Sequence, residues 1–504
     1  MKINIIGAGI SGLSVGCFLQ MKGFETEIFE KHNLPGGLCT SWQSGGYTFN
    51  GAIHWLMGSN QSNPFYQLWS QLIDLDSIEF VHHESKADIE LEQNTDKYGS
   101  RVFHFYTNLA RFEQYMLDIA PEDAAQIKKL IRSMRRIQKF EVPPEVKTPP
   151  ALYSMKQKIG MIKHLPLLFF MLRSRHITNF TFADQLKNPF LKEAFRQIYD
   201  GTEVPMVVLT IPHAFADLKG TGYPIGGSLA FSKKIEEKYL SLGGKINYSS
   251  GVKEILVENN SATGVLLEDG RAFRSDLVIS AADWYFTVFQ ALKGRFTDQK
   301  ILDLRDGKSF EVYYAAINIS LGISKPMDDY PHFSRFPIPR ELKSPDGTVY
   351  KRLELHVYNY DPTLAPAGKT SVSVSFYTQN GNFWIDLLKN DPQKYKKVKD
   401  EFAREVIGLL EQKFAGLKDY IEVVNVATPA TYHQYTNNWQ GSTQGWLPGR
   451  NIMASSPVGF ELPGLKNFYY CSHWSMPGGG LPTAVKTAND VAMIISKKHK
   501  IKIQ

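Results

Sequence analysis

Cysteine and long apolar runs are both scarce in this chain of 504 residues. Its three cysteines, Cys17, Cys39 and Cys471, form no C-x-x-C pair and do not have the spacing of metal ligands. A small, odd number of cysteines argues against a disulfide framework and against a metal site, and it indicates a reducing compartment. No stretch reaches about 18 uninterrupted apolar residues, so we expect no transmembrane helix.

The chain also has little room for a targeting segment and no general excess of charge. Met1 and Lys2 lead at once into an apolar run, so we expect a cytoplasmic protein. The net charge of +7 is concentrated in residues 126–176, which contain twelve Lys and Arg but only two Glu. No nucleic-acid-reading motif accompanies this charge, and nucleic acid is therefore not an expected partner.

A glycine fingerprint is the first motif that is present. Residues 3–6 read as a short strand that runs directly into G-x-G-x-x-G. The first glycine of such a motif allows a tight turn, the second lets the backbone approach a pyrophosphate, and the third lets the helix pack closely. The helix N-terminus then favours the phosphate charge. The residues predicted to bind cofactor here are Gly7, Ala8, Gly9, Ile10, Ser11 and Gly12.

An acidic residue stands where a dinucleotide site needs one. Glu30 falls 18 residues after Gly12, at the end of the second predicted strand. A carboxylate at that position accepts hydrogen bonds from ribose hydroxyls and repels a 2′-phosphate. The fingerprint therefore predicts a bound dinucleotide, and an αβ turn without ligand is the alternative.

Two further glycine clusters favour FAD over NAD. Gly36 and Gly37 follow the ribose-binding strand, where a loop can lie against the diphosphate or the flavin. Near the other end of the chain, Gly478-Gly479-Gly480 precedes a predicted helix over 482–495. Glycines let the backbone pass close to a ring, and the helix N-terminus would point at the electron-rich flavin. We expect FAD held between the two ends of the chain.

These motifs together resemble one known group, the phytoene desaturase, carotenoid isomerase and retinol saturase family of flavoproteins. The resemblance spans nearly the whole chain and is carried by G-A-G-I-S-G at 7–12, Glu30, P-G-G at 35–37, Y-P-I-G-G at 223–227 and M-P-G-G-G-L-P at 476–482. Trp42 and the segments 45–49 and 51–54 are more similar to the isomerase and saturase branch than to bacterial phytoene desaturases. Leu38 stands where the family often has arginine, and no acid precedes the final glycines.

The resemblance implies an α/β fold, namely a two-domain flavoprotein with a Rossmann-like FAD-binding domain and a mixed α+β substrate domain. The FAD domain would be discontinuous and comprise residues 1–60, 221–295 and 455–504. The substrate domain would comprise residues 61–220 and 296–454 and cover an apolar tunnel. The resemblance also implies that the Val252 backbone contacts the adenine, and that Gly479, Gly480 and Leu481 line the flavin.

The activity implied is that of an FAD-dependent oxidoreductase or isomerase acting on carbon–carbon double bonds of a long apolar polyene. The polyene would be a carotenoid, a retinoid or a related isoprenoid lipid. A phytoene-type desaturase, a flavin amine oxidase and a non-enzymatic prenyl-lipid binder remain alternatives. His54 and His473 adjoin the flavin motifs and are the candidate proton-handling residues, with a structural role as the alternative. Tyr432, His433, Tyr435 and Trp439 form an aromatic cluster that would either wall the substrate or pack in the core.

The basic region 126–176 carries the remaining prediction. Residues 126–140 read as a basic amphipathic helix, and an apolar stretch over 159–172 with basic flanks follows. Such a region suits a peripheral contact with the inner face of the membrane, where an apolar substrate could enter. A lid packed on the substrate domain, with a solvated basic face, is the alternative. The sequence gives no indication of the oligomeric state.

Overall fold

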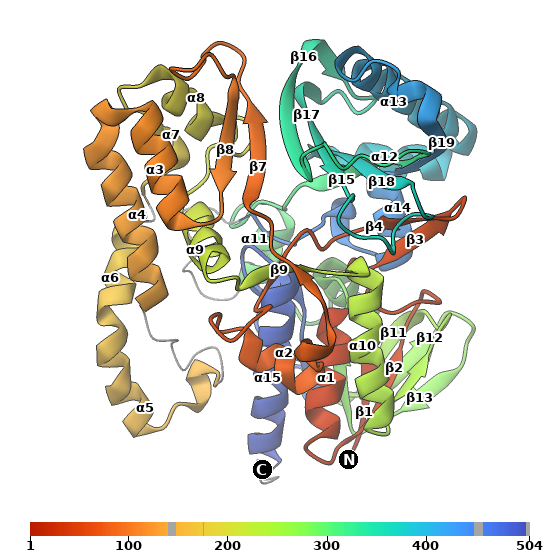
Figure 1. Ribbon diagram of the computed structural model, residues 1–504. Coiled ribbons are helices and arrows are strands. Elements are labelled where there is room, and N and C mark those ends of the chain that lie inside the picture. Colours follow the sequence, from red (N-terminus) through yellow and green to blue (C-terminus); the bar gives the residue numbers. More distant parts are fainter. Residues whose placement is uncertain (140–147, 175, 448–456, 500–504) are drawn as a thin grey trace.

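The computed structural model describes residues 1–139, 148–174, 176–447 and 457–499 (Figure 1). Both described chain ends lie in the lower part of the molecule, beneath a sheet with its own helices and a separate group of helices. Residues 140–147 and 175 of the basic region and the expected domain joint at 454/455 lie outside the described residues.

The lower part contains a parallel five-stranded sheet in the order β10-β2-β1-β14-β20. Its strands are β1 (Lys2–Ile6), β2 (Glu25–Phe29), β10 (Lys245–Asn247), β14 (Leu277–Ser280) and β20 (Phe468–Tyr470). The central strand β1 pairs with β2 and β14, so that Ile5 lies between Ile28 and Ile279. Ile5 is fully buried, as the apolar run before the fingerprint predicts for a strand covered on both faces. The expected α/β, Rossmann-like fold class is confirmed.

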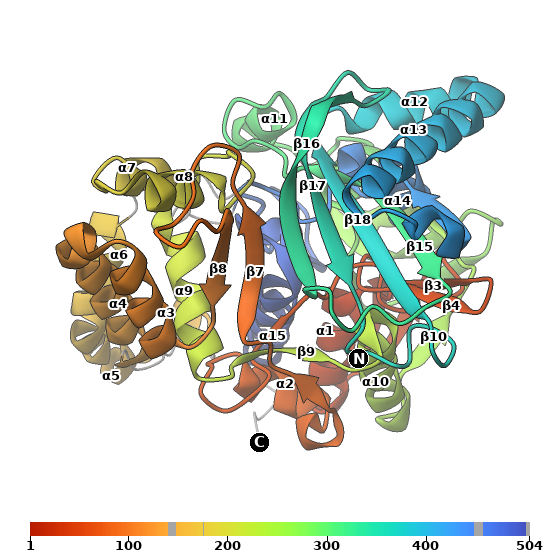
Figure 2. The ribbon, with the colours of Figure 1, turned by 45° about the horizontal axis from the view of Figure 1, so that its top comes forward.

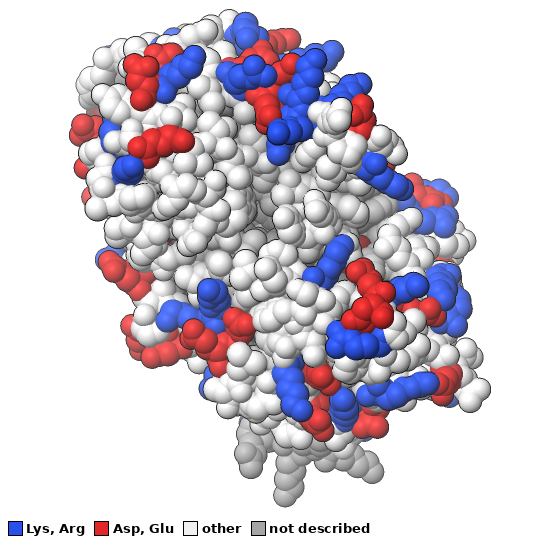
Figure 3. Space-filling model, turned by 90° about the vertical axis from the view of Figure 1, so that its right-hand side faces the viewer, with Lys and Arg blue, Asp and Glu red and all other residues white. Residues whose placement is uncertain are grey.

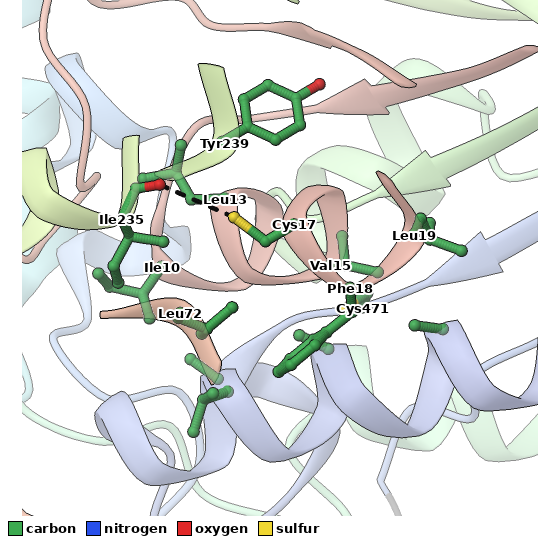
Figure 4. Close-up of a cluster of buried hydrophobic side chains, with 14 of the residues drawn as sticks. Ile10, Leu13, Val15, Cys17, Phe18, Leu19, Leu72, Ile235, Tyr239 and Cys471 are labelled. Carbon is green, nitrogen blue, oxygen red and sulfur yellow. Dashed lines mark hydrogen bonds between the residues drawn. The ribbon is translucent and has the colours of Figure 1, made fainter. Parts of the chain in front are cut away.

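Three helices pack together beside this sheet (Figure 4). They are α1 (Ile10–Gln20), α10 (Gly227–Ser241) and α15 (Gly480–Lys498). Close packing of α1 on α10 depends on Gly16, because a Cβ there would lie 2.6 Å from the Tyr239 ring. Cys17 points toward the Ile235 carbonyl at 3.7 Å, and burial raises the pKa of its thiol to about 12. All three cysteines are free and buried, so each behaves as a small apolar side chain.

The upper sheet has seven strands in the order β19-β15-β18-β17-β16-β7-β8, and only β16 and β7 pair in parallel (Figure 2). The strands are β7 (Ser85–Glu90), β8 (Val102–Tyr106), β15 (Ala315–Ile323), β16 (Phe333–Lys343), β17 (Val349–Val357), β18 (Thr370–Thr378) and β19 (Ile421–Ala427). The helices α12 (Gly381–Asn390), α13 (Pro392–Lys413) and α14 (Pro429–Thr436) accompany this sheet. Just before β15 begins at Ala315, Val312 forms a lone bridge with Trp446.

Short strands and a helical group complete the fold. The short strands are β3 (Ser41–Ser44), β4 (Tyr47–Asn50), β5 (Leu56–Met57), β6 (Phe80–Val81), β9 (Thr221–Pro224), β11 (Val252–Glu258), β12 (Ser261–Leu267) and β13 (Ala272–Arg274). The remaining α-helices are α2 (Tyr66–Leu72), α3 (Leu109–Ile119), α4 (Ala124–Lys139), α5 (Met155–Gly160), α6 (Leu165–Ser174), α7 (Asn179–Ala183), α8 (Pro189–Gln197), α9 (Met206–Asp217) and α11 (Gln299–Arg305). Among the described residues, no helix is both long and apolar enough to cross a bilayer.

Helix α4 is the amphipathic helix that was expected in the basic region. Its apolar residues, including Ile127, Ile131 and Met134, are buried in a core shared with α3, α8 and α9. Its basic side chains lie on the solvent side, where Arg135 pairs with Glu113 at 2.9 Å. The apolar face of α4 is therefore buried inside the protein, and only its basic face is exposed.

Candidate functional site

A cavity of about 450 Å³ lies at the carboxyl ends of β1, β2 and β14, between the lower and upper sheets. Ligands of open parallel sheets bind at this edge, where the strand order reverses. Most of the residues expected to bind cofactor or handle protons line the cavity. They are Gly7, Gly9, Ile10, Ser11, Glu30, Gly36, Gly37, His54, Val252, His473, Gly479, Gly480 and Leu481. Ala8 and Gly12 do not line it but support the residues that do.

The fingerprint loop is shaped by steric constraints at two of its glycines. Gly7 has φ +95°, a conformation that side chains rarely adopt. A Cβ at Gly12 would lie 1.9 Å from the Gly7 carbonyl oxygen, so only glycine lets α1 begin this close to the loop. No side chain caps the N-terminus of α1, whose first N–H groups are thus free of a side-chain acceptor. That arrangement fits a phosphate.

Glu30 is held in place by the same loop. Its Oε2 accepts a hydrogen bond from the Ala8 N–H at 2.6 Å, and its Oε1 accepts one from the His32 N–H at 2.8 Å. Burial raises the pKa of the carboxyl, while these two N–H donors act in the opposite direction. Each carboxylate oxygen keeps a second acceptor position, which fits a ribose hydroxyl.

The Gly36-Gly37 loop lies directly against the fingerprint. The Gly36 N–H donates to the Ala8 carbonyl at 2.8 Å. A Cβ on Gly36 would lie 2.2 Å from the Cys39 carbonyl oxygen, and one on Gly37 would lie 3.3 Å from the Gly9 Cα. Side chains at either glycine would therefore push the two loops apart and change the floor of the cavity.

The C-terminal glycines bring a second helix N-terminus to the cavity. Gly478, Gly479 and Gly480 all have positive φ, and a Cβ on Gly479 would overlap the Gln444 carbonyl oxygen at 1.7 Å. Helix α15 starts at Gly480 without a side-chain cap. Two uncapped helix N-termini, from opposite ends of the chain, thus meet one cavity, which fits an elongated, anionic dinucleotide.

Both candidate histidines are uncharged at neutral pH. Burial lowers the pKa of His54 to about 4, and it does the same for His473. His54 stacks on His356 of β17, whereas the buried Nε2 of His473 has no hydrogen-bond partner among the described residues. An unpaired buried nitrogen at a cavity wall fits a ligand that completes its hydrogen bonding.

The aromatic cluster divides between the two roles considered for it. Tyr432 and Tyr435 line the cavity, and the Asn318 amide donates to the Tyr432 hydroxyl at 2.5 Å. The ring of His433 instead contacts the Asn438 carbonyl at 3.0 Å, and Trp439 stacks on Tyr285 with planes inclined by 3°. Half of the cluster thus walls the cavity and half packs beside it.

Asp283 is a cavity residue that the sequence analysis missed. It follows β14, and its carboxylate accepts the N–H groups of Phe286 and Trp439 at 2.8 and 2.9 Å. Burial raises the pKa of this carboxyl to about 7. The sequence did contain a signal for this residue, namely an acid three residues after an apolar strand, where ligands of a parallel sheet bind. Tyr377 of β18 also lines the cavity and gave no signal, because it belongs to a different sheet and lies far from the fingerprint in the sequence.

Comparison with known proteins agrees with this geometry. Residues 5–72 match the model of an NAD(P)-binding Rossmann-like domain. The chain is 24% identical to prolycopene isomerase 1, chloroplastic, of an Oncidium hybrid cultivar, over 95% of this chain and 80% of that protein. It is also 24% identical to a lycopene-forming phytoene desaturase of Pseudescherichia vulneris, over 98% and 99% of the two chains. An oxidoreductase from Methanosarcina mazei has a similar structure, with a TM-score of 0.60, 19% identity and coverage of 99% and 100%.

The fold and the cavity define a dinucleotide-binding, Rossmann-like protein with a mixed-sheet second region. Over nearly its full length, at 23–24% identity, the chain is similar to members of the phytoene desaturase and prolycopene isomerase family of oxidoreductases. At this level of identity the matches include both desaturases and isomerases.

Proposed function

We propose that the protein is an FAD-dependent enzyme that acts on carbon–carbon double bonds of a long apolar polyene, in the manner of the isomerase and saturase branch. The observation that carries this proposal is the convergence of two uncapped helix N-termini and three glycine segments on one cavity with aromatic walls. Bound FAD would supply hydride exchange with a carbon of the polyene.

The residues would divide the work as follows. The glycine loops and Glu30 hold the dinucleotide, with Val252 at the adenine and Leu481 at the flavin. Segments 1–60, 221–295 and 455–504 form the cofactor-binding domain, and segments 61–220 and 296–454 hold the substrate. The apolar and aromatic walls exclude water from the reacting carbons. His54 and His473, both neutral at the cavity wall, remain the candidate proton-handling residues.

We also propose a peripheral membrane contact in the cytoplasm, through a surface that we call the α5–α6 patch. It comprises Met155, Ile159, Ile162, Leu165 and Phe169, whose exposed fractions range from 41% to 72%. Exposed Lys156, Lys158 and Lys163 adjoin it. Apolar side chains that enter the acyl boundary beside lysines that meet anionic headgroups are the two elements of an interfacial site.

The proposed activity is tested by anaerobic incubation of the purified protein with a poly-cis carotene, all-trans-retinol and phytoene, with the flavin oxidised or reduced. Mass and isomer retention time distinguish the reactions. A gain of two hydrogens identifies a saturase, an unchanged mass with a new isomer identifies an isomerase, and a loss of two hydrogens identifies the phytoene-type desaturase. A colourless protein that cannot be reconstituted with flavin would overturn the proposal in favour of a lipid binder.

A further inference from the structure

Lys86 is a cation placed beside the cavity with no role in the site described above. It belongs to β7, and its Nζ lies 4.6 Å from the centre of the Trp55 ring. Trp55 follows His54 in the chain, and both line the cavity. Lys86 is half-buried, and its ammonium lies against the ring of a residue that lines the cavity, whereas Lys86 is not itself a lining residue.

The acidic residues near Lys86 in the sequence are all engaged by other side chains. Glu84 pairs with Arg111 at 2.7 Å, Asp88 contacts the His104 ring at 3.0 Å, and Glu90 pairs with Lys413. Within the part of the chain that the structure describes, no carboxylate lies within ion-pair distance of the Lys86 ammonium.

His213, whose ring is close enough to Lys86 to respond to its charge, also supplies no compensating negative charge. His213 of α9 is fully buried, and burial together with the positive charge of Lys86 lowers its pKa to about 3. Burial alone lowers the pKa of Lys86 to about 8, so the amine is still mostly protonated at neutral pH. A desolvated cation without an anion is unfavourable, and the ring of Trp55 offsets only part of that cost.

We propose that Lys86 binds a carboxylate at one end of the polyene, with the apolar body of the substrate along the cavity past Trp55. A carboxylate would supply the anion that the protein does not provide, and the charge-assisted hydrogen bond would form in surroundings of low polarity. This inference rests on the proposed function and narrows its substrate class to polyenes that carry an acidic end group.

The inference predicts different affinities for two ligands, all-trans-retinoic acid and its methyl ester, of which only the acid carries a negative charge. Their Kd values for the flavin-loaded protein can be measured by quenching of tryptophan fluorescence. We expect the acid to bind about tenfold more tightly than the ester at neutral pH. This preference should fall as the pH rises through the pKa of Lys86, because the neutral amine no longer attracts the carboxylate.

Variants at this position assign the preference to the charge. Lys86→Met keeps the length of the side chain and should abolish the preference, with ester binding unchanged. Lys86→Arg should keep the preference and move its loss to higher pH, which also shows that the site tolerates substitution. Lys97→Met, which removes an exposed lysine paired with Asp118, is the matched control and should behave as wild type.

The outcomes distinguish this inference from the proposed function. Equal Kd values for acid and ester, or a preference that survives in Lys86→Met, would overturn the role of Lys86 and leave the polyene proposal intact. Failure of both retinoids and of an unmodified carotene to bind would overturn the polyene proposal and this inference with it.

Discussion

His54 stacks on His356 with ring centroids 4.1 Å apart and planes inclined by 16°. His54 follows the β3–β4 hairpin in the N-terminal part of the chain, whereas His356 belongs to β17 of the upper sheet. Burial lowers the pKa of both rings, and each ring would be repelled by a charge on the other. The contact between the cofactor side and the upper sheet is therefore made by two neutral imidazoles.

The first prediction follows from this stack. In the free protein, the His54 ring should titrate near its lowered pKa of about 4, because protonation would place an unsolvated charge against His356. Measurement of the ring resonances by NMR as a function of pH, with His54→Gln for assignment, checks this. A pKa at or above the ordinary value for histidine would show that His54 is solvated or paired and that the stack is absent.

The second prediction concerns Gly9, where the protein leaves room for an added side chain. A Cβ there would have only ordinary contacts, with the Gly36 carbonyl oxygen at 3.9 Å and the Gly37 Cα at 4.0 Å. Gly9→Val should therefore fold but lose bound flavin, because the side chain blocks the approach of the pyrophosphate. Flavin absorbance per protein and circular dichroism measure the two properties. Normal flavin content in Gly9→Val would contradict the site assignment.

The third prediction is a contrast between two helical glycines. Gly12→Ala should destabilise the protein by several kcal/mol, since its Cβ would overlap the Gly7 carbonyl oxygen at 1.9 Å. Gly408→Ala in α13 has nothing within 4 Å of the new Cβ and should stabilise the protein by up to about 1 kcal/mol. Urea unfolding of both variants tests this, and equal midpoints would show that α1 does not pack against the loop as described.

The fourth prediction is a loss of stability in acid through His213. Its pKa of about 3 lies below the ordinary value of 6.5, so on acidification the unfolded chain binds a proton before the native protein does. The stability that the neutral His213 ring contributes is therefore fully present above pH 6.5. It is lost as the pH falls toward 3. From pH 6.5 to 5, this group alone should cost about 2 kcal/mol.

The control for that prediction is His213→Leu, which removes the titrating ring from its stack on Phe105 at 4.3 Å. The variant should be less stable at neutral pH, because the branched Leu side chain does not reproduce the planar ring contact with Phe105. Its stability should, however, depend less on pH by about the same 2 kcal/mol, measured by urea unfolding at both pH values. An unchanged pH dependence would mean that another group governs acid unfolding.

The sequence predicted best those features that depend on short-range steric rules. The fingerprint and Glu30 belong to one strand-turn-helix-strand unit, whose geometry is nearly determined by its glycines, and they line the cavity as a group. Tyr377 and His356, the partner of His54, could not be located in this way, because both belong to the upper sheet and reach the site through the packing of separate sheets. Asp283 follows a strand of the lower sheet, so its position in the sequence did carry a signal.

The basic region is a second case in which a local pattern predicted an element but not what the element packs against. The spacing of Ile127, Ile131 and Met134 correctly predicted an amphipathic helix, since periodicity reports which residues share a face. It could not report what that face packs against, and the structure gives α4 a protein core. Which apolar residues remain exposed is a property of the whole fold, and these turned out to be in α5 and α6.

The fifth prediction compares the contributions of the α5–α6 patch and of the basic face of α4 to membrane binding. Ile159→Asp with Phe169→Asp should reduce pelleting with phosphatidylserine-containing liposomes by about tenfold or more, because two side chains exposed by 63% and 66% would no longer enter the acyl boundary. Replacement of the exposed Lys128, Lys129 and Arg132 of α4 by Gln should only weaken the salt-dependent part of binding, because these charges act at a distance through a screened field. Liposomes of neutral lipid are the control. The wild-type protein should bind to them about as well as it binds to phosphatidylserine-containing liposomes at high salt, because in both cases only the apolar contacts remain. If the aspartate variant pellets like the wild type while the glutamine variant does not, the membrane contact lies on α4 and is purely electrostatic.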